Sequence, residues 1–133
     1  MDRRVVVTGM GALTSLGSAI PTLWERLCRG ESGVGFITRF DTTEYPAKIG
    51  GEVVDFDPAV YMDKHDIRRT DRFVQLAIAA SQEAMTDAGL SIAANDAERC
   101  GVYIGTAFGG MESLESVHTT LITKGPKRVS PQI

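Results

Sequence analysis

The two cysteines and two histidines of this chain are the side chains that could supply a nucleophile or bind a metal. A nucleophilic cysteine needs a lowered pKa, which a helix N-terminus or a protonated histidine commonly provides. Cys28 falls at the C-terminal end of a predicted helix, where the helix dipole disfavours a thiolate, and Cys100 opens a predicted buried strand. We interpret both as small core residues. His65 and His118 have no neighbouring glutamate at metal-ligand spacing, so the residues indicate neither a metal site nor a complete catalytic constellation.

A glycine pair after a β-branched run is the second candidate for ligand chemistry. Gly9-Met10-Gly11 follows residues 4–8, as in a dinucleotide-binding turn, but the third glycine of that motif is replaced by Thr14. The next predicted helix is capped only at Ser18, too late to present its N-terminus to a pyrophosphate. We therefore interpret the glycines as residues that turn the chain at the end of a strand.

Basic side chains gather in two segments of a chain whose net charge is −3. Residues 64–72 contain four bases and two acids, and residues 124–128 contain three bases. A solvated surface is the simpler reading, whereas a docking surface for an acidic partner is the functional one, because opposite charges speed encounter. The whole chain has no basic excess of the kind that predicts binding to nucleic acid.

Alternating strands and helices must position these segments. Residues 4–8 and 100–106 are apolar in nearly every position, which predicts strands buried on both faces in a helix-covered parallel sheet. Periodic apolar positions predict further elements: helices over residues 19–28, 71–88 and 111–122, a short strand over 48–53 and a turn at Asp57-Pro58. The fold class is therefore α/β.

The helix over residues 71–88 has an unusual composition. Thr70 is its candidate N-cap, and Gly89 with Leu90 fits a Schellman ending. Within residues 73–80 only Gln75 is polar, and alanines recur along the helix. A helix without a solvated face must be covered on several sides, so we expect a central helix between sheets, approached closely by its neighbours.

Length and composition describe one globular domain. The chain has 133 residues, 43% of them hydrophobic and 23% charged. No apolar run approaches the roughly 18 residues that span a bilayer, and no secretory signal is recognisable, so we expect no membrane association. Two distant cysteines fit a reducing compartment, so we expect a cytoplasmic protein. The end after an extended segment, together with one very apolar helix, suggests a piece of a larger protein.

Five motifs in this order resemble those of one enzyme family. They are Arg3-Arg4-Val5-Val6-Val7-Thr8-Gly9-Met10-Gly11, residues 33–41, Arg69-Thr70-Asp71-Arg72-Phe73-Val74-Gln75, Gly105-Thr106-Ala107-Phe108-Gly109-Gly110 and Gly125-Pro126-Lys127-Arg128-Val129-Ser130-Pro131. Their spacing is similar to that of the β-ketoacyl-(acyl-carrier-protein) synthase II family of bacterial fatty-acid synthesis, along the whole chain and in register. The chain looks like the N-terminal third of such an enzyme.

The resemblance implies a thiolase-like layered fold, of which residues 1–133 would be the N-terminal part of the first half only. It also implies a decarboxylating Claisen condensation that elongates acyl-carrier protein with malonyl-carrier protein, in a homodimer that needs no metal or cofactor. The nucleophilic cysteine and two histidines of the family lie beyond Ile133, so no catalytic residue falls in this chain and the chain alone is expected to be inactive.

Binding residues can be transferred by the same resemblance. Phe108 and Met111 match positions that line the acyl-chain tunnel, and Ile133 matches a position that reaches the partner subunit's tunnel. Four bases match positions that dock the acidic acyl carrier protein in its acyl and malonyl forms: Arg68, Arg69, Lys127 and Arg128. His65 stands where the family commonly has a base. Because the family often has an aliphatic residue at Phe108 and an aromatic one at Ile133, the resemblance does not set the preferred acyl chain length.

Two function classes remain open at this point. One is the condensing enzyme, and the other is a non-catalytic relative such as a chain-length-factor-like subunit of a polyketide synthase. An alanine-cysteine-(serine or threonine)-glycine sequence downstream of Ile133 would belong only to the enzyme.

Overall fold

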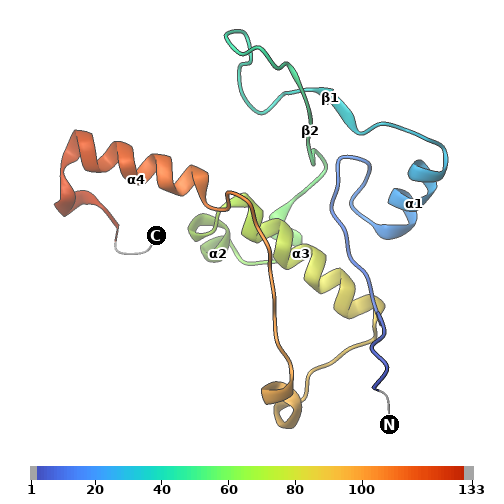
Figure 1. Cartoon of the computed structure of the whole chain (residues 1–133). Coiled ribbons are helices and arrows are strands. Elements are labelled where there is room, and N and C mark those ends of the chain that lie inside the picture. The colour runs from blue at the N-terminus through green and yellow to red at the C-terminus, as the bar shows by residue number, and fades with distance from the viewer. Residues whose placement is uncertain (1–2, 131–133) are drawn as a thin grey trace.

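The computed structural model of the chain describes residues 3–130, apart from the side chains of residues 94 and 95. Figure 1 shows α3 near the middle of the structure, with the N-terminal segment running beside it and α4 extending away from it. The elements are α1 (Ile20–Cys28), β1 (Val34–Phe36), β2 (Ile49–Gly51), α2 (Lys64–Arg69), α3 (Arg72–Asp87) and α4 (Met111–Lys124), with 3-10 turns η1 (Pro58–Val60), η2 (Ala94–Arg99) and η3 (Pro126–Arg128).

The helix predicted over residues 71–88 is present as α3, and its C-terminal end has the predicted Schellman geometry. The amide of Leu90 donates to the carbonyl oxygen of Met85 at 2.9 Å, and the amide of Gly89 donates to the carbonyl oxygen of Thr86 at 3.0 Å. Gly89 has a φ of 59°, which a side chain would disfavour. The predicted cap at the other end is wrong, because Asp71 rather than Thr70 is the N-cap residue.

The other two predicted helices are also confirmed. α1 ends at Cys28 with Gly30 at a φ of 68°, but its N-cap is Ala19 and not Ser18. α4 covers residues 111–122 and continues to Lys124. α2 was not predicted, since its six residues carry no apolar periodicity.

The two buried strands predicted over residues 4–8 and 100–106 are wrong for the described part of the chain. Both segments are extended but unpaired, and Val5 and Tyr103 are 96% and 97% exposed. The sheet that the described residues form is the antiparallel pair β1–β2, in which Val34 faces Gly51 and Phe36 faces Ile49. A buried parallel strand needs partners on both edges, and these residues supply none.

The glycine pair near the N-terminus packs directly on α3. A Cβ on Gly9 would lie 2.2 Å from the carbonyl oxygen of Ala84, and one on Gly11 would lie 2.0 Å from that of Ala80. Neither glycine has a positive φ, and residues 9–11 form no turn or bend, so the interpretation that they turn the chain is wrong. They are glycines because the backbone lies against the alanine face of α3, which confirms the close approach predicted for this helix.

Burial elsewhere is shallow. Within the described residues only Phe56, Gln75 and Ala79 are buried, so the covering predicted around α3 is absent here, and Cys28 and Cys100 are exposed rather than core residues. The accessible surface is 11,008 Å² for 14.3 kDa. A compact monomer of this mass exposes about 6,800 Å². The chain therefore leaves a large apolar area uncovered.

Candidate functional site

Two of the four predicted docking residues lie on α2, and the sequence just before this helix explains why it forms. The carboxylate of Asp63 accepts from the amides of His65 at 2.8 Å and Asp66 at 2.9 Å, which caps the helix. These amides, that of Asp66 first, lower the pKa of Asp63. Arg68 and Arg69 then fall in the last turn, where the helix dipole favours cations, and both are exposed.

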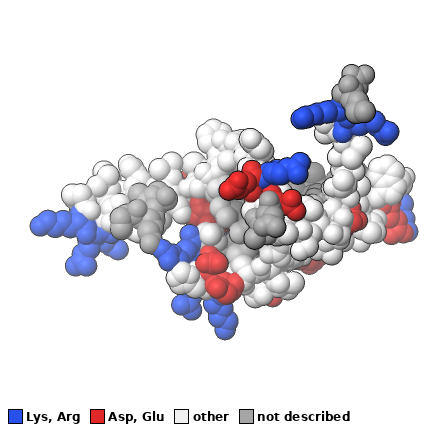
Figure 2. All heavy atoms as spheres, turned by 90° about the horizontal axis from the view of Figure 1, so that it is seen from below, with Lys and Arg blue, Asp and Glu red and all other residues white. Residues whose placement is uncertain are grey.

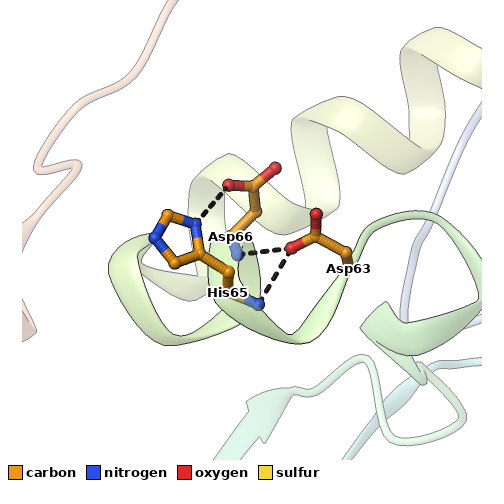
Figure 3. A group of neighbouring side chains, drawn as sticks. All are labelled: Asp63, His65 and Asp66. Carbon is orange, nitrogen blue, oxygen red and sulfur yellow. Dashed lines mark hydrogen bonds and ion pairs between the residues drawn. The ribbon is translucent and has the colours of Figure 1, made fainter.

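The cap also brings together Asp63, His65 and Asp66, a combination of side chains that can hold a metal ion (Figure 3). Their binding atoms are already engaged. One oxygen of Asp63 serves the cap, Nδ1 of His65 lies 3.3 Å from Asp66 Oδ1, and Nε2 of His65 lies 3.0 Å from Nη1 of Arg69. A guanidinium beside the imidazole disfavours a second cation, so the group is a helix cap and not a metal centre.

The other two predicted docking residues, Lys127 and Arg128, lie exposed on η3, which follows α4 after a turn at Gly125 with a φ of 81°. η3 packs against α4, and Figure 1 shows it at the far end of α4 from α2. A helix of 14 residues is about 21 Å long. Figure 2 shows Lys and Arg side chains in separate groups on the face it presents. The two predicted clusters lie on different elements, α2 and η3, with α4 between α2 and η3 along the chain.

A contact between the starts of two helices sets where α4 begins relative to α2 and α3. Ser113 Oγ donates to Asp71 Oδ1 at 2.5 Å, and the amide of Ser113 donates to Asp71 Oδ2 at 3.3 Å. The N-cap residue of α3 thus also places its carboxylate at the N-terminus of α4, where the dipole stabilises a negative charge. The sequence analysis missed this pair, which 42 positions separate along the chain.

Gln75 connects α2 to α3. Its side-chain nitrogen donates to the carbonyl oxygens of Ile67 at 3.0 Å and Thr70 at 2.8 Å. A buried amide that satisfies two carbonyls at the end of α2 fixes the angle between the helices. The orientation of Arg68 and Arg69 therefore depends on Gln75, the polar residue within the apolar segment of α3.

Of the two described tunnel candidates, Phe108 lies in the turn before α4 and Met111 is the first residue of that helix. Phe108 is 81% exposed and Met111 is 43% exposed, whereas Ile133 lies outside the described residues. The turn rests on α3, because a Cβ on Gly109 would lie 2.7 Å from the ring of Phe73. An apolar groove of about 420 Å³ runs along α3 beside this turn, but neither Phe108 nor Met111 lines it.

The described residues contain no helix that is long and apolar enough to cross a membrane. The two cysteines form no disulfide and neither lies in the clusters above. The described residues predicted to bind thus lie on α2, on η3, in the turn before α4 and at the first residue of α4, and neither cysteine is among them.

Known proteins resemble this chain over almost its whole length. The chain is 48% identical over 130 residues to 3-oxoacyl-[acyl-carrier-protein] synthase 2 of Staphylococcus aureus (strain COL), covering 98% of this chain and 31% of that protein. It is 46% identical over 129 residues to the protein of the same name from Coxiella burnetii (strain RSA 493 / Nine Mile phase I), covering 97% and 31%. The chain thus spans about a third of the length of these relatives.

Solved structures of ketosynthases share the fold. "The ishigamide ketosynthase/chain length factor" aligns with a TM-score of 0.77 at 30% identity, over 98% of this chain and 33% of that one. A type II polyketide synthase acyl-carrier protein in complex with its ketosynthase (AntDE:AntF) aligns with a TM-score of 0.72 at 25% identity, over 100% and 35%.

The model of one protein family, described as beta-ketoacyl synthase, N-terminal domain, matches residues 2–133. This match confirms the resemblance predicted from the five motifs. Because it covers nearly every residue, and because relatives 48% identical extend over 98% of the sequence, the chain belongs to the β-ketoacyl synthase family.

Proposed function

We propose that this chain works as the N-terminal part of a β-ketoacyl-acyl-carrier-protein synthase II, an acyltransferase that elongates acyl-carrier protein with malonyl-carrier protein in fatty-acid biosynthesis. The observation that carries the proposal is the 48% identity to proteins named 3-oxoacyl-[acyl-carrier-protein] synthase 2. The reaction is a decarboxylating Claisen condensation, in which a cysteine outside these residues holds the acyl group and two histidines promote decarboxylation. The chain's own contribution is binding, and it has no catalytic residue.

The same proposal includes a thiolase-like layered fold for residues 1–133, a homodimer and a cytoplasmic location, with no metal or cofactor. Two features support the layers. The extended apolar segments 4–8 and 100–106 need strand partners, and the groove of about 420 Å³ along α3 is lined by apolar side chains, including Phe73, Val102 and Ile104. The remainder of such a fold would supply both kinds of cover.

Acidic carrier protein is the proposed partner of the basic clusters. Arg68 and Arg69 on α2 and Lys127 and Arg128 on η3 are exposed cations, and η3 follows the 14-residue helix α4, which is about 21 Å long. An elongated acidic partner can contact both clusters at once. Phe108, Met111 and Ile133 are the proposed acyl-chain residues, and the exposure of Phe108 and Met111 leaves them free to meet an acyl chain or a covering segment.

The docking assignment is tested in the complete enzyme with the double variant Arg68→Ala, Lys127→Ala. Exposed interfacial charges act mainly on encounter and are screened over about 8 Å at physiological ionic strength. We expect kcat/KM for carrier-bound acyl groups to fall, more at low salt than at high salt, while kcat/KM for a small thioester such as acyl-CoA is unchanged. An equal loss on both substrates would mean damage to the fold or active site, and the docking assignment would be dropped.

A non-catalytic chain-length-factor-like subunit is the second candidate. It is favoured by the structure whose title names a chain length factor, which is 30% identical, and it is weaker because the condensing enzymes are 48% identical. The complete protein distinguishes them by mass spectrometry after incubation with an acyl thioester. A covalent acyl adduct on a cysteine indicates the enzyme, and its absence in a folded protein indicates the non-catalytic subunit.

A further inference from the structure

A polar cleft of about 460 Å³ lies between α4 and the adjoining parts of α2 and α3. Three arginines line it, namely Arg39, Arg68 and Arg72, each from a different segment. The carboxyl groups of Asp71 and Glu112 also line it, as do the hydroxyl groups of Thr70, Ser113 and Ser116. The cleft is therefore rich in hydrogen-bond donors and has more positive than negative groups.

Arg72 lines the cleft, and its guanidinium group is held in place by two interactions. One guanidinium nitrogen donates to the carbonyl oxygen of Val53 at 2.5 Å, and the group lies 5.2 Å above the ring centre of Phe56. Partial burial lowers the pKa of Arg72, and the charge of Arg39 lowers it further. An arginine nevertheless stays protonated at neutral pH, so two cations face each other here.

Arg39 is presented to the cleft by a loop that is itself held in place. The carboxylate of Glu52 accepts from the amide of Thr38 at 3.0 Å, from its hydroxyl at 2.8 Å and from the amide of Arg39 at 3.2 Å. The side chain of Arg39 is exposed. The loop backbone is thus fixed while the guanidinium stays available.

None of the three arginines forms an ion pair with another described residue. The ion pairs between described residues involve Arg26, Arg29 and His65. Asp71 directs both oxygens to Ser113, and Glu112 lies in the cleft without coming within ion-pair distance of a guanidinium. The hydrogen bond from the amide of Thr38 is the main cause that lowers the pKa of Glu52, and the charge of Arg39 lowers it further, but this carboxylate already accepts from the loop amides. Guanidinium groups gathered without a direct ion pair can take an added anion, because each presents paired N–H donors.

We propose that this cleft takes a carboxylate side chain of the acidic carrier protein, and that Arg39 is a docking residue in addition to the four already named. The inference rests on the proposed function. Arg68 belongs both to the cleft and to the basic end of α2, so the cleft continues the proposed docking surface inward. A planar guanidinium matches a carboxylate in two parallel hydrogen bonds, which gives Arg39 a role in fixing the orientation of the partner.

The test measures the dissociation constant of the complete enzyme for carrier protein with and without its phosphate-linked prosthetic arm. Arg39→Ala is expected to weaken binding about three- to tenfold at low salt, equally for both carrier forms, because a carboxylate on the carrier surface is present in each. Arg39→Lys is expected to recover only part of this loss. Arg29→Ala is the matched control, because Arg29 is an exposed arginine that pairs with Glu25 on α1.

Each of three other outcomes would contradict the proposal that the cleft takes a carboxylate of the carrier protein. A loss confined to the carrier with the prosthetic arm would assign the cleft to a phosphate group instead of a carboxylate. Unchanged binding in Arg39→Ala, with a loss in Arg68→Ala, would reject the cleft and leave the proposed function standing. Unchanged binding in both variants would remove the carrier-docking part of the proposed function as well.

Discussion

A single methyl group at position 11 tests how the N-terminal segment packs on α3. In Gly11→Ala the new Cβ would lie 2.0 Å from the carbonyl oxygen of Ala80 and 2.8 Å from the amide nitrogen of Ala84. Both atoms belong to the helix backbone, so neither can rotate away. The segment must therefore lift off α3 by more than about 1 Å to restore ordinary contact distances.

The cost of this displacement follows from the contacts it breaks. The amide of Met10 donates to Asp87 at 2.9 Å, and the amide of Ala12 donates to Glu83 at 3.2 Å. Overpacking a close contact costs about 1–3 kcal/mol. Each hydrogen bond contributes about 0.5–1.5 kcal/mol. We expect Gly11→Ala to lower the free energy of unfolding by about 2–6 kcal/mol, the upper end applying if both hydrogen bonds are lost.

Urea unfolding of the complete enzyme gives the change in stability, and hydrogen exchange at the amides of Met10 and Ala12 reports the displacement itself. Gly35→Ala is the control, because a Cβ there would meet no atom within 4 Å. Its effect should stay within about 0.5 kcal/mol. If Gly11→Ala is as stable as Gly35→Ala and keeps both amides protected, the packing of this segment on α3 is not as described.

Two further predictions concern the isolated chain and one carboxylate. The 133-residue chain alone should bind a hydrophobic dye and lack a cooperative thermal transition, because it exposes 11,008 Å² of surface. It should form no β-ketoacyl product from acyl- and malonyl-carrier protein, because the cysteine proposed to hold the acyl group lies outside these residues. A sharp transition from a monomer, or turnover above background, would contradict this. The hydrogen bond from the amide of Thr38 is the main cause that lowers the pKa of Glu52. The ionised carboxylate therefore stabilises the Arg39 loop fully above the unfolded pKa of 4.5, and this stabilisation is lost as the pH falls through the lower folded pKa. Protection of the Thr38 amide, measured relative to its intrinsic exchange rate at each pH, should therefore fall on acidification, and Glu52→Gln should remove that dependence.

Local sequence signals predicted the helices well. The Schellman ending of α3 needs only Gly89 and Leu90, and the end of α1 needs only Gly30, so neighbouring residues determine both. The cap of α2 had a local signal too, an aspartate at position 63 whose carboxylate reaches the next two amides, but the short helix had no apolar pattern to mark it. Helices over 71–88 and 111–122 were accordingly predicted, and α2 was not.

Structural features that depend on residues far apart in the sequence could not be predicted from local patterns. The apolar segments 4–8 and 100–106 have strand composition, but a strand also needs a hydrogen-bonding neighbour, and no described residue provides one. The docking arginines were identified by resemblance. Arg39 and the Asp71–Ser113 contact were missed because each depends on segments brought together only by the fold.

The packing surface on α3 and the proposed docking clusters on α2 and η3 are separate in this chain. Gly9 and Gly11 lie on one side of α3, and Val102 and Ile104 line the groove on it, so both unpaired apolar segments use this helix as their support. α2 and η3 contribute none of the strongly exposed large apolar side chains of the described residues. The charged surfaces of α2 and η3 therefore need no covering segment. The apolar surface does, because the chain exposes 11,008 Å², whereas a compact monomer of its mass exposes about 6,800 Å². Substitutions of the proposed docking bases should consequently change partner binding without changing stability, and substitutions of the alanines of α3 that contact Gly9 and Gly11 should do the reverse.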